Sequence, residues 1–117
     1  MLTFLCYTRC ITCIKAKKWL DENGIEYTFR DIKIDNPSVD EIKKWHKESG
    51  LDIKKFFNTS GNLYKSMNLK EKLETMTDQE KYELLASDGL LVKRPLLVSE
   101  EFVVTGFKQQ DWEKLLK

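Results

Sequence analysis

The sequence predicts an α/β protein whose mixed four-stranded sheet is interrupted by a helical insertion. Three observations predict this class. Residues 1–34 read as strand, helix and strand, and residues 91–117 read as two strands followed by a helix. Between them, helix-capping motifs mark roughly residues 36–90 as helical.

The first segment has the pattern of a βαβ unit. Residues 1–7, MLTFLCY, form a short apolar run typical of a buried strand. From Ile11 to Asn23 the apolar residues mostly recur at helical spacing, and Gly24 is a typical helix end. Residues 25–34 alternate and contain β-branched and aromatic residues, which predicts a second strand. Such units have a right-handed crossover and parallel strands.

The middle of the chain is predicted to be helical. Ser38 and Glu41 form a capping box, and the helix that they open is expected to end at Gly50. Thr77 and Glu80 form a second capping box, which opens another helix. Short helical pieces are expected between these two helices.

The C-terminal segment predicts a hairpin and a helix. Pro95 stands at the first position of a strand, where it costs no ladder hydrogen bond, and Leu96–Val98 continue that strand. A tight turn at 99–101 leads into a second strand at 102–104, and residues 109–116 form a short amphipathic helix. The whole order is that of a thioredoxin-like, or glutaredoxin-like, sheet.

The length indicates one domain. A chain of 117 residues suits one hydrophobic core. We therefore expect a single thioredoxin-like domain over 1–117, with its core in 1–35 and 91–117 and the insertion at about 36–90.

Charge and hydropathy argue against several classes of partner. The 20 basic and 19 acidic residues leave a net charge of +1, which is no footprint for nucleic acid or for an anionic membrane. No apolar run approaches the roughly 20 residues needed to span a bilayer. The first five residues lack the basic region of a signal peptide. We expect a cytoplasmic protein.

Three cysteines, Cys6, Cys10 and Cys13, lie within the first 13 residues. In a reducing compartment, clustered thiols are more often catalytic, redox-sensing or metal-binding than structural. Cys10 is expected where the first strand turns into the first helix, and unpaired N–H groups and the helix dipole there favour a thiolate. Cys13, one helical turn further on, is expected to be more enclosed and to close a disulfide with Cys10. In this hypothesis Cys10 attacks and Cys13 resolves.

Other interpretations of these cysteines remain open. One CxxC is half of a four-cysteine zinc site, and only Cys6 and His46 could complete it. Both cysteines of the pair could also be buried core residues. Cys6, on a strand, is expected to be a small buried hydrophobe rather than a third redox partner. We expect no metal and no cofactor.

Three segments resemble a known family: CYTRCITCIKAKKWLDENGIEYTFRDI, LLVKRPLLV and VVTGFKQQDWEKLL. They are similar to the family that joins glutaredoxin-coupled arsenate reductases of the ArsC type with Spx-type redox regulators. The CxxC places the chain closer to the Spx-type branch. The resemblance implies a thioredoxin-like fold and a redox-active Cys10. It also implies that Pro95 is the family's cis proline, packed against the active-site cysteines.

The resemblance leaves three functions to compare. Arsenate reductases hold the oxyanion with three arginines; only Arg94 matches, Lys93 is a weak substitute, and Asn58 stands where the second is expected. Spx-type regulators dock on the RNA polymerase α subunit, and Gly50 could match a glycine of their docking surface. The surrounding segment KESGLDIKKFF departs from the family in length and sequence.

A thiol–disulfide oxidoreductase needs only features that the sequence shows. Cys10 attacks a disulfide or a glutathionylated thiol, and glutathione or another low-molecular-weight thiol supplies electrons. Arg94 is expected to support the thiolate or hold a substrate carboxylate. Thr8 and Arg9 lie where a substrate approaches, and Tyr7 borders the cleft or packs. This is the predicted function; a Spx-like regulator is the alternative, and arsenate reduction ranks third.

Overall fold

The computed structural model describes residues 2–117, and its centre is a four-stranded sheet in the order β2-β1-β3-β4. The strands are β1 (Thr3–Cys6), β2 (Thr28–Asp31), β3 (Leu96–Val98) and β4 (Val103–Thr105). β1 pairs in parallel with β2, while β3 is antiparallel to both β1 and β4. The mixed sheet predicted from the sequence is confirmed.

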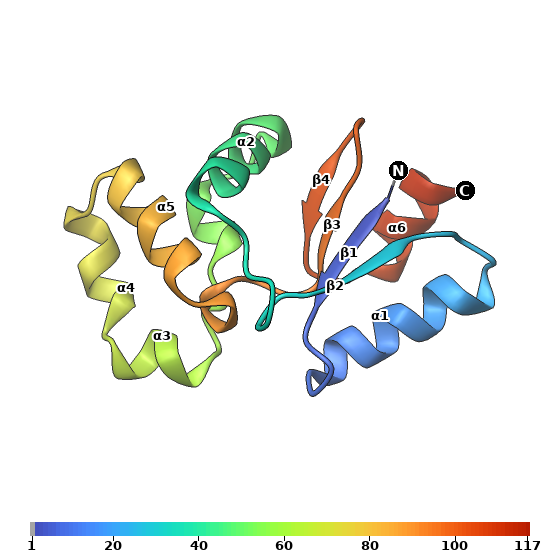
Figure 1. Ribbon diagram of the computed structural model, residues 1–117, viewed down its shortest axis with the longest axis horizontal. Helices are drawn as coiled ribbons and strands as arrows, with labels where there is room; N and C mark the ends of the chain where they lie inside the picture. Colours follow the sequence, from blue (N-terminus) through green and yellow to red (C-terminus); the bar gives the residue numbers. More distant parts are fainter. Residues whose placement is uncertain (1) are drawn as a thin grey trace.

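Helices lie on both sides of this sheet (Figure 1). On one side are α1 (Ile11–Glu22) and α6 (Gln109–Leu116). On the other side is the insertion, whose elements between β2 and β3 are, in order, α2 (Val39–Ser49), η1 (Ile53–Phe56), α3 (Asn62–Ser66), α4 (Leu69–Lys72), η2 (Leu73–Thr75), α5 (Asp78–Ser87) and η3 (Gly89–Leu91). The α/β architecture is that of the thioredoxin-like class.

The first two expected strands are longer than those observed, whereas β4 has the expected length and is shifted by one residue. The second was expected over 25–34, but β2 keeps only Thr28–Asp31. Asp31 ends it because its carboxylate accepts the backbone N–H groups of Lys33 and Ile34 and turns the chain. Part of the first expected strand, Met1, lies outside the described residues, and β1 itself ends at Cys6.

The helix boundaries follow the capping motifs closely. Ser38 accepts the N–H of Glu41, whose carboxylate accepts the N–H of Ser38 in return, so the predicted box opens α2. Thr77 and Glu80 open α5 in the same way. α2 ends at Gly50, which has a left-handed conformation.

Strand alternation divides the core into two clusters. Phe4 and Cys6 face α1 and α6, and they pack with Cys13, Leu20 and Trp112, among others. Leu5, between them, faces the insertion and packs in the second cluster. Each face of the sheet is therefore covered by a buried hydrophobic cluster. These clusters fix the positions of the chain segments that follow the strands.

Two main-chain contacts fasten the insertion to the sheet just before β3. Phe57 and Val92 form an isolated antiparallel bridge. Beside it, Asn58 N–H donates to Leu91 O at 2.8 Å, and Lys93 N–H donates to Phe56 O at 2.8 Å. This bridge positions the next residues of the chain, Arg94 and Pro95.

Candidate functional site

Cys10 lies where β1 has ended and α1 begins. It is the N-cap of α1, and its backbone is extended at φ −91° and ψ 123°. Its N–H donates to Tyr7 O, and its carbonyl accepts the N–H of Ile14, both at 3.0 Å. The thiol is free and half-buried, and it makes no capping hydrogen bond. It thus stands at a helix start whose first N–H groups lack partners within the helix.

The structure pairs Cys13 differently from our expectation. Cys13 is bonded to Cys6, with 5.8 Å between their Cα atoms, whereas the sequence predicted a bond to Cys10. Cys6 is fully buried, as expected, but it is a disulfide partner and not merely a small core residue. The catalytic roles assigned to Cys10 and Cys13 remain predictions.

A signal for the Cys6–Cys13 pairing was present in the sequence. Cys6 shares a strand face with Phe4, since side chains two apart point the same way. Cys13 shares a helix face with Ala16 and Leu20, and all three are buried. This face of β1 packs against this face of α1, so the sulfurs of Cys6 and Cys13 lie in the same interface between strand and helix. The strand pattern predicts a buried Cys6, but it does not say which helix Cys6 faces.

Tyr7 connects the cysteines with Arg94. Its N–H donates to Cys13 Sγ at 3.4 Å, and its carbonyl accepts the N–H of Cys10. The Arg94 guanidinium carbon lies 5.6 Å from the centroid of the Tyr7 ring, and Lys33 Nζ lies 5.7 Å from it. Tyr7 therefore has two cations near its ring, and each of its two backbone polar groups is hydrogen-bonded to a cysteine.

Pro95, which follows Arg94, is hydrogen-bonded to the residue directly after the edge strand β4. The Arg94–Pro95 peptide bond is cis, as the resemblance implied. Pro95 is buried, and its carbonyl accepts the N–H of Gly106 at 2.8 Å. Gly106 has φ +76°, a left-handed conformation that favours glycine, and Lys93 lies against it. Thr8 and Arg9 are both exposed in the turn before Cys10.

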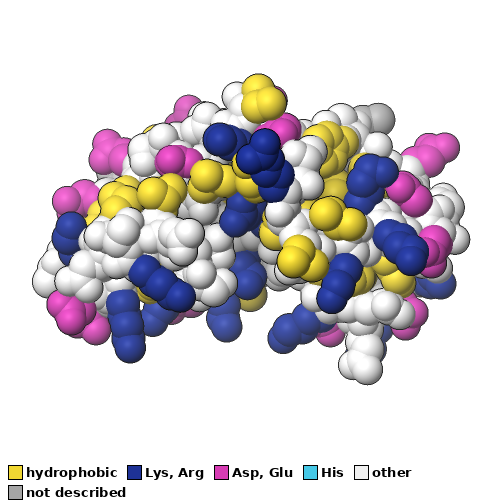
Figure 2. Space-filling model, turned by 90° about the horizontal axis from the view of Figure 1, so that it is seen from below, with side chains coloured by type: hydrophobic (Ala, Val, Ile, Leu, Met, Phe, Trp, Pro, Cys, Tyr) yellow, Lys and Arg dark blue, Asp and Glu magenta, His cyan; other side chains and the backbone are white. Residues whose placement is uncertain are grey.

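A basic cleft lies between the insertion and the sheet. Its volume is about 880 Å³, and Thr12 of α1 reaches its wall. Five cations line it, against the carboxylates of Asp52 and Asp111: Lys54, Lys55, Lys93, Arg94 and Lys108. Seen from below, dark blue side chains surround the hollow between the two parts of the molecule (Figure 2). This surface suits an anionic group.

The start of α1 is unusually apolar for an exposed surface. Ile11 is 71% exposed and Ile14 is 56% exposed, although both belong to the apolar pattern that predicted the helix. They flank Cys10 and Cys13 in the sequence and are turned away from the core. An exposed apolar surface next to a thiol suits a peptide or other organic substrate better than a bare inorganic ion.

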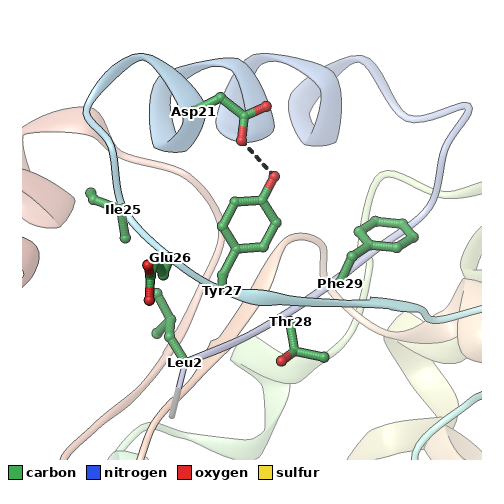
Figure 3. Close-up of a pocket in the computed structure, with 7 residues that line it drawn as sticks. All are labelled: Leu2, Asp21, Ile25, Glu26, Tyr27, Thr28 and Phe29. Atoms are coloured by element: carbon green, nitrogen blue, oxygen red, sulfur yellow. Dashed lines mark hydrogen bonds between the residues drawn. The ribbon is translucent and has the colours of Figure 1, made fainter.

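A second hollow, of about 650 Å³, lies at the edge strand β2. No cysteine is among the residues that line either hollow, but Thr12, two residues after Cys10, lines the basic cleft. Figure 3 shows the hydroxyl of Tyr27 directed toward Asp21, to which it donates at 2.8 Å. Lys17 donates to the same carboxylate at 2.8 Å and holds the pKa of Asp21 below its usual value. Burial raises the pKa of Tyr27. These polar groups satisfy one another, so we place the candidate site at the basic cleft.

The described residues form neither a metal-binding cluster nor a cluster of arginines for an oxyanion. Within residues 2–117, no three His, Cys, Asp or Glu side chains gather closely enough to hold a metal ion. His46 lies in α2 and hydrogen-bonds Tyr82 at 2.7 Å. Arg30 is paired with Glu41 at 2.7 Å and Asp35 at 3.3 Å. Of the arginines in the described chain, Arg94 alone lines the basic cleft.

No helix among the described residues is both long enough and apolar enough to cross a membrane.

Comparison with known proteins gives consistent results. The model of the ArsC family matches residues 5–115. A crystal structure of an ArsC family related protein from Bacteroides fragilis is 60% identical, with a TM-score of 0.94, over 97% of this chain and 96% of that chain. The uncharacterized protein YusI of Bacillus subtilis strain 168 is 53% identical over 97% of this chain and 96% of its own length.

Some of the proteins that are similar to this chain are transcriptional regulators. The global transcriptional regulator Spx 1 of Bacillus anthracis is 30% identical over 99% of this chain and 87% of its own length. The similarity therefore includes the insertion as well as the sheet. The family match covers nearly the whole described chain, and the Arg94–Pro95 bond is cis, as the resemblance implied. The chain belongs to the ArsC family.

Proposed function

We propose that the protein is a glutaredoxin-like thiol–disulfide oxidoreductase in which Cys10 is the attacking group. One observation carries this proposal: Cys10 is a free, half-buried thiol at the start of α1. Cys6 and Cys13, in contrast, are sealed in the core. Cys10 is thus the cysteine that a substrate in solution can reach.

The reaction proceeds by two exchanges. The Cys10 thiolate attacks one sulfur of a substrate disulfide, so the substrate S–S bond breaks and the leaving thiolate takes a proton from solvent. The other product then leaves by one of two routes. Reduced Cys13 attacks Cys10 Sγ, releases the second product thiol and closes a Cys10–Cys13 disulfide, which two low-molecular-weight thiols such as glutathione reduce again. Alternatively, where glutathione is the half left on Cys10, a second glutathione attacks its sulfur, so that oxidised glutathione forms and Cys10 leaves as the thiolate. In both routes the low-molecular-weight thiols supply the two electrons.

The surroundings of Cys10 support an anionic organic disulfide as substrate. The basic cleft offers cations for carboxylates, and Arg94 can bind one with two parallel hydrogen bonds. The exposed Ile11 and Ile14 offer apolar contact beside the thiol. A glutathione mixed disulfide combines both chemistries, and so does a protein disulfide flanked by acidic residues.

The test measures turnover of a glutathione mixed disulfide, with glutathione as reductant. We expect Cys10→Ser to lower the rate at least 100-fold, because the nucleophile is removed. Arg94→Ala should raise KM for the anionic substrate about 10- to 150-fold, since a hydrogen bond to a charged group is worth about 1.5–3 kcal/mol. Lys70→Ala, an exposed lysine on α4 outside the cleft, is the matched control. Full activity in Cys10→Ser would refute the proposal.

A second candidate function is a redox-dependent regulator that docks on the α subunit of RNA polymerase. The similarity to Spx 1 over 99% of this chain favours it, as does the exposure of Gly50 at the end of α2. The test is capture of the purified C-terminal domain of that α subunit by reduced and by oxidised protein. Redox-dependent capture by a chain that is inert toward disulfides would favour the regulator, and Gly50→Arg should abolish that capture.

Arsenate reduction has less support. The basic cleft contains Arg94 but neither of the two further arginines that would complete an oxyanion cradle. Release of arsenite from arsenate in the presence of glutaredoxin would overturn this ranking.

A further inference from the structure

We propose that Cys6 is a third redox-active cysteine, and that Cys13 is a shared sulfur that exchanges between Cys6 in the core and Cys10 at the surface. The consequence for turnover rests on the function proposed above, but the exchange itself does not.

Geometry places Cys13 within reach of both partners. Its bond to Cys6 spans 5.8 Å between Cα atoms, inside the range of about 4.4–6.8 Å that disulfides adopt. Cys10 is the N-cap of the same helix, three residues earlier, so its side chain leaves the chain one turn before that of Cys13. Cys10 is also packed against the cluster that contains Cys6 and Cys13.

Tyr7 hydrogen-bonds two of the three cysteines, Cys10 and Cys13. Its carbonyl accepts the N–H of Cys10, and its own N–H points at Cys13 Sγ, with the distances given above. One residue thus fixes the backbone of the attacking cysteine and donates to the shared sulfur. Cys13 stays bonded throughout the exchange, and this N–H helps to hold its sulfur in place while its partner changes.

The exchange balances without any outside oxidant. The Cys10 thiolate attacks Cys13 Sγ, the Cys6–Cys13 bond breaks, and a Cys10–Cys13 bond forms. Cys6 leaves as a thiolate and takes up the proton that Cys10 lost. It is fully buried among apolar groups, where a charge is costly, so it rests as a neutral thiol. The reverse step needs the same proton to return.

The position of the bond then decides which chemistry the protein performs. With Cys6–Cys13 closed, as observed, Cys10 is the free thiol and Cys13 is not available to resolve a mixed disulfide. The protein then works as a monothiol and needs glutathione for release. With Cys6 reduced, Cys13 is available and the protein works as a dithiol.

The sequence allows a direct test, because trypsin cleaves after Arg9 and Lys15. A Cys6–Cys13 bond cross-links the peptides 1–9 and 10–15, whereas a Cys10–Cys13 bond lies within peptide 10–15. The protein is equilibrated with oxidised dithiothreitol, quenched with acid, alkylated, digested and mapped by mass spectrometry. We expect both species in the wild type, only the cross-link in Cys10→Ser, and only the internal bond in Cys6→Ala.

A kinetic arm tests the exchange itself. Wild-type protein isolated with the cross-link and a free Cys10 should convert in part to the internal form when it is returned to neutral pH without added thiol. Two free thiols in oxidised Cys10→Ser, or a cross-linked wild type that never converts, would overturn the proposal. If Cys6→Ala fails to fold by near-ultraviolet circular dichroism, the wild type and Cys10→Ser still decide. Reductase turnover is measured on the same samples. If the protein shows no turnover but the peptide maps still show both disulfides, the proposed function fails and the disulfide exchange stands.

Discussion

The close approach of η3 to the end of β2 makes Gly89→Ala the sharpest test of this structure. A Cβ built on Gly89 would lie 1.8 Å from the carbonyl oxygen of Ile32 and 2.6 Å from its carbonyl carbon. Both atoms are main chain, so no side chain can rotate away. Ordinary carbon–oxygen contacts are about 3.3 Å or longer, so the two backbones must separate by about 1.5 Å.

Neither backbone is free to move that far. Ile32 N–H donates to Cys6 O at 3.0 Å, which ties it to the sheet. Gly89 O accepts the N–H of Val92 at 3.1 Å, and Val92 forms the bridge that positions Arg94. Overpacking costs about 1–3 kcal/mol, and each lost hydrogen bond adds about 1 kcal/mol. We expect Gly89→Ala to lower the free energy of unfolding by about 3–5 kcal/mol.

Urea unfolding followed by tryptophan fluorescence measures this loss, with Gly24→Ala as the matched control. Gly24 has φ +65°, and an added Cβ there would meet nothing within 4 Å, so only backbone strain of about 1–2 kcal/mol is expected. A Gly89→Ala protein within 1 kcal/mol of the wild type would refute the packing of η3 on β2. Failure to fold supports it only if Gly24→Ala folds.

Two further predictions concern the core and an ion pair. Trp112 is 1% exposed, and its ring lies 4.8 Å from that of Phe107, so Trp112→Ala should cost about 3–5 kcal/mol in urea unfolding; a loss under 1 kcal/mol would contradict this packing. The two hydrogen bonds from Arg30 hold the pKa of Glu41 below its usual value. The folded pKa is therefore the lower one, so the stabilisation is complete above the unfolded pKa and is lost as pH falls through the folded pKa. Glu41→Gln should cost about 1 kcal/mol at pH 7, reduced by solvent screening, and this difference should shrink below about pH 4 in parallel urea titrations; a difference that stays constant with pH would contradict it.

The sequence by itself determined the elements and their order. The capping boxes at Ser38 and Thr77 opened helices where they were expected, and Pro95 preceded a strand of a hairpin. These signals succeed because each is local: a cap satisfies N–H groups three residues away, and a proline acts on its own peptide bond. The position of Cys10 at a helix start was predictable for the same reason.

Only the tertiary structure decided the partner of Cys13 and the composition of the cleft. Strand alternation and helical periodicity indicate on which face a residue lies, but they do not indicate which of the other two cysteines bonds to Cys13. Lys54 and Lys108 are far apart in the chain and meet at one cleft because the bridge between Phe57 and Val92 brings the insertion against the sheet. Contacts between distant segments depend on packing of the whole core, which no local pattern encodes.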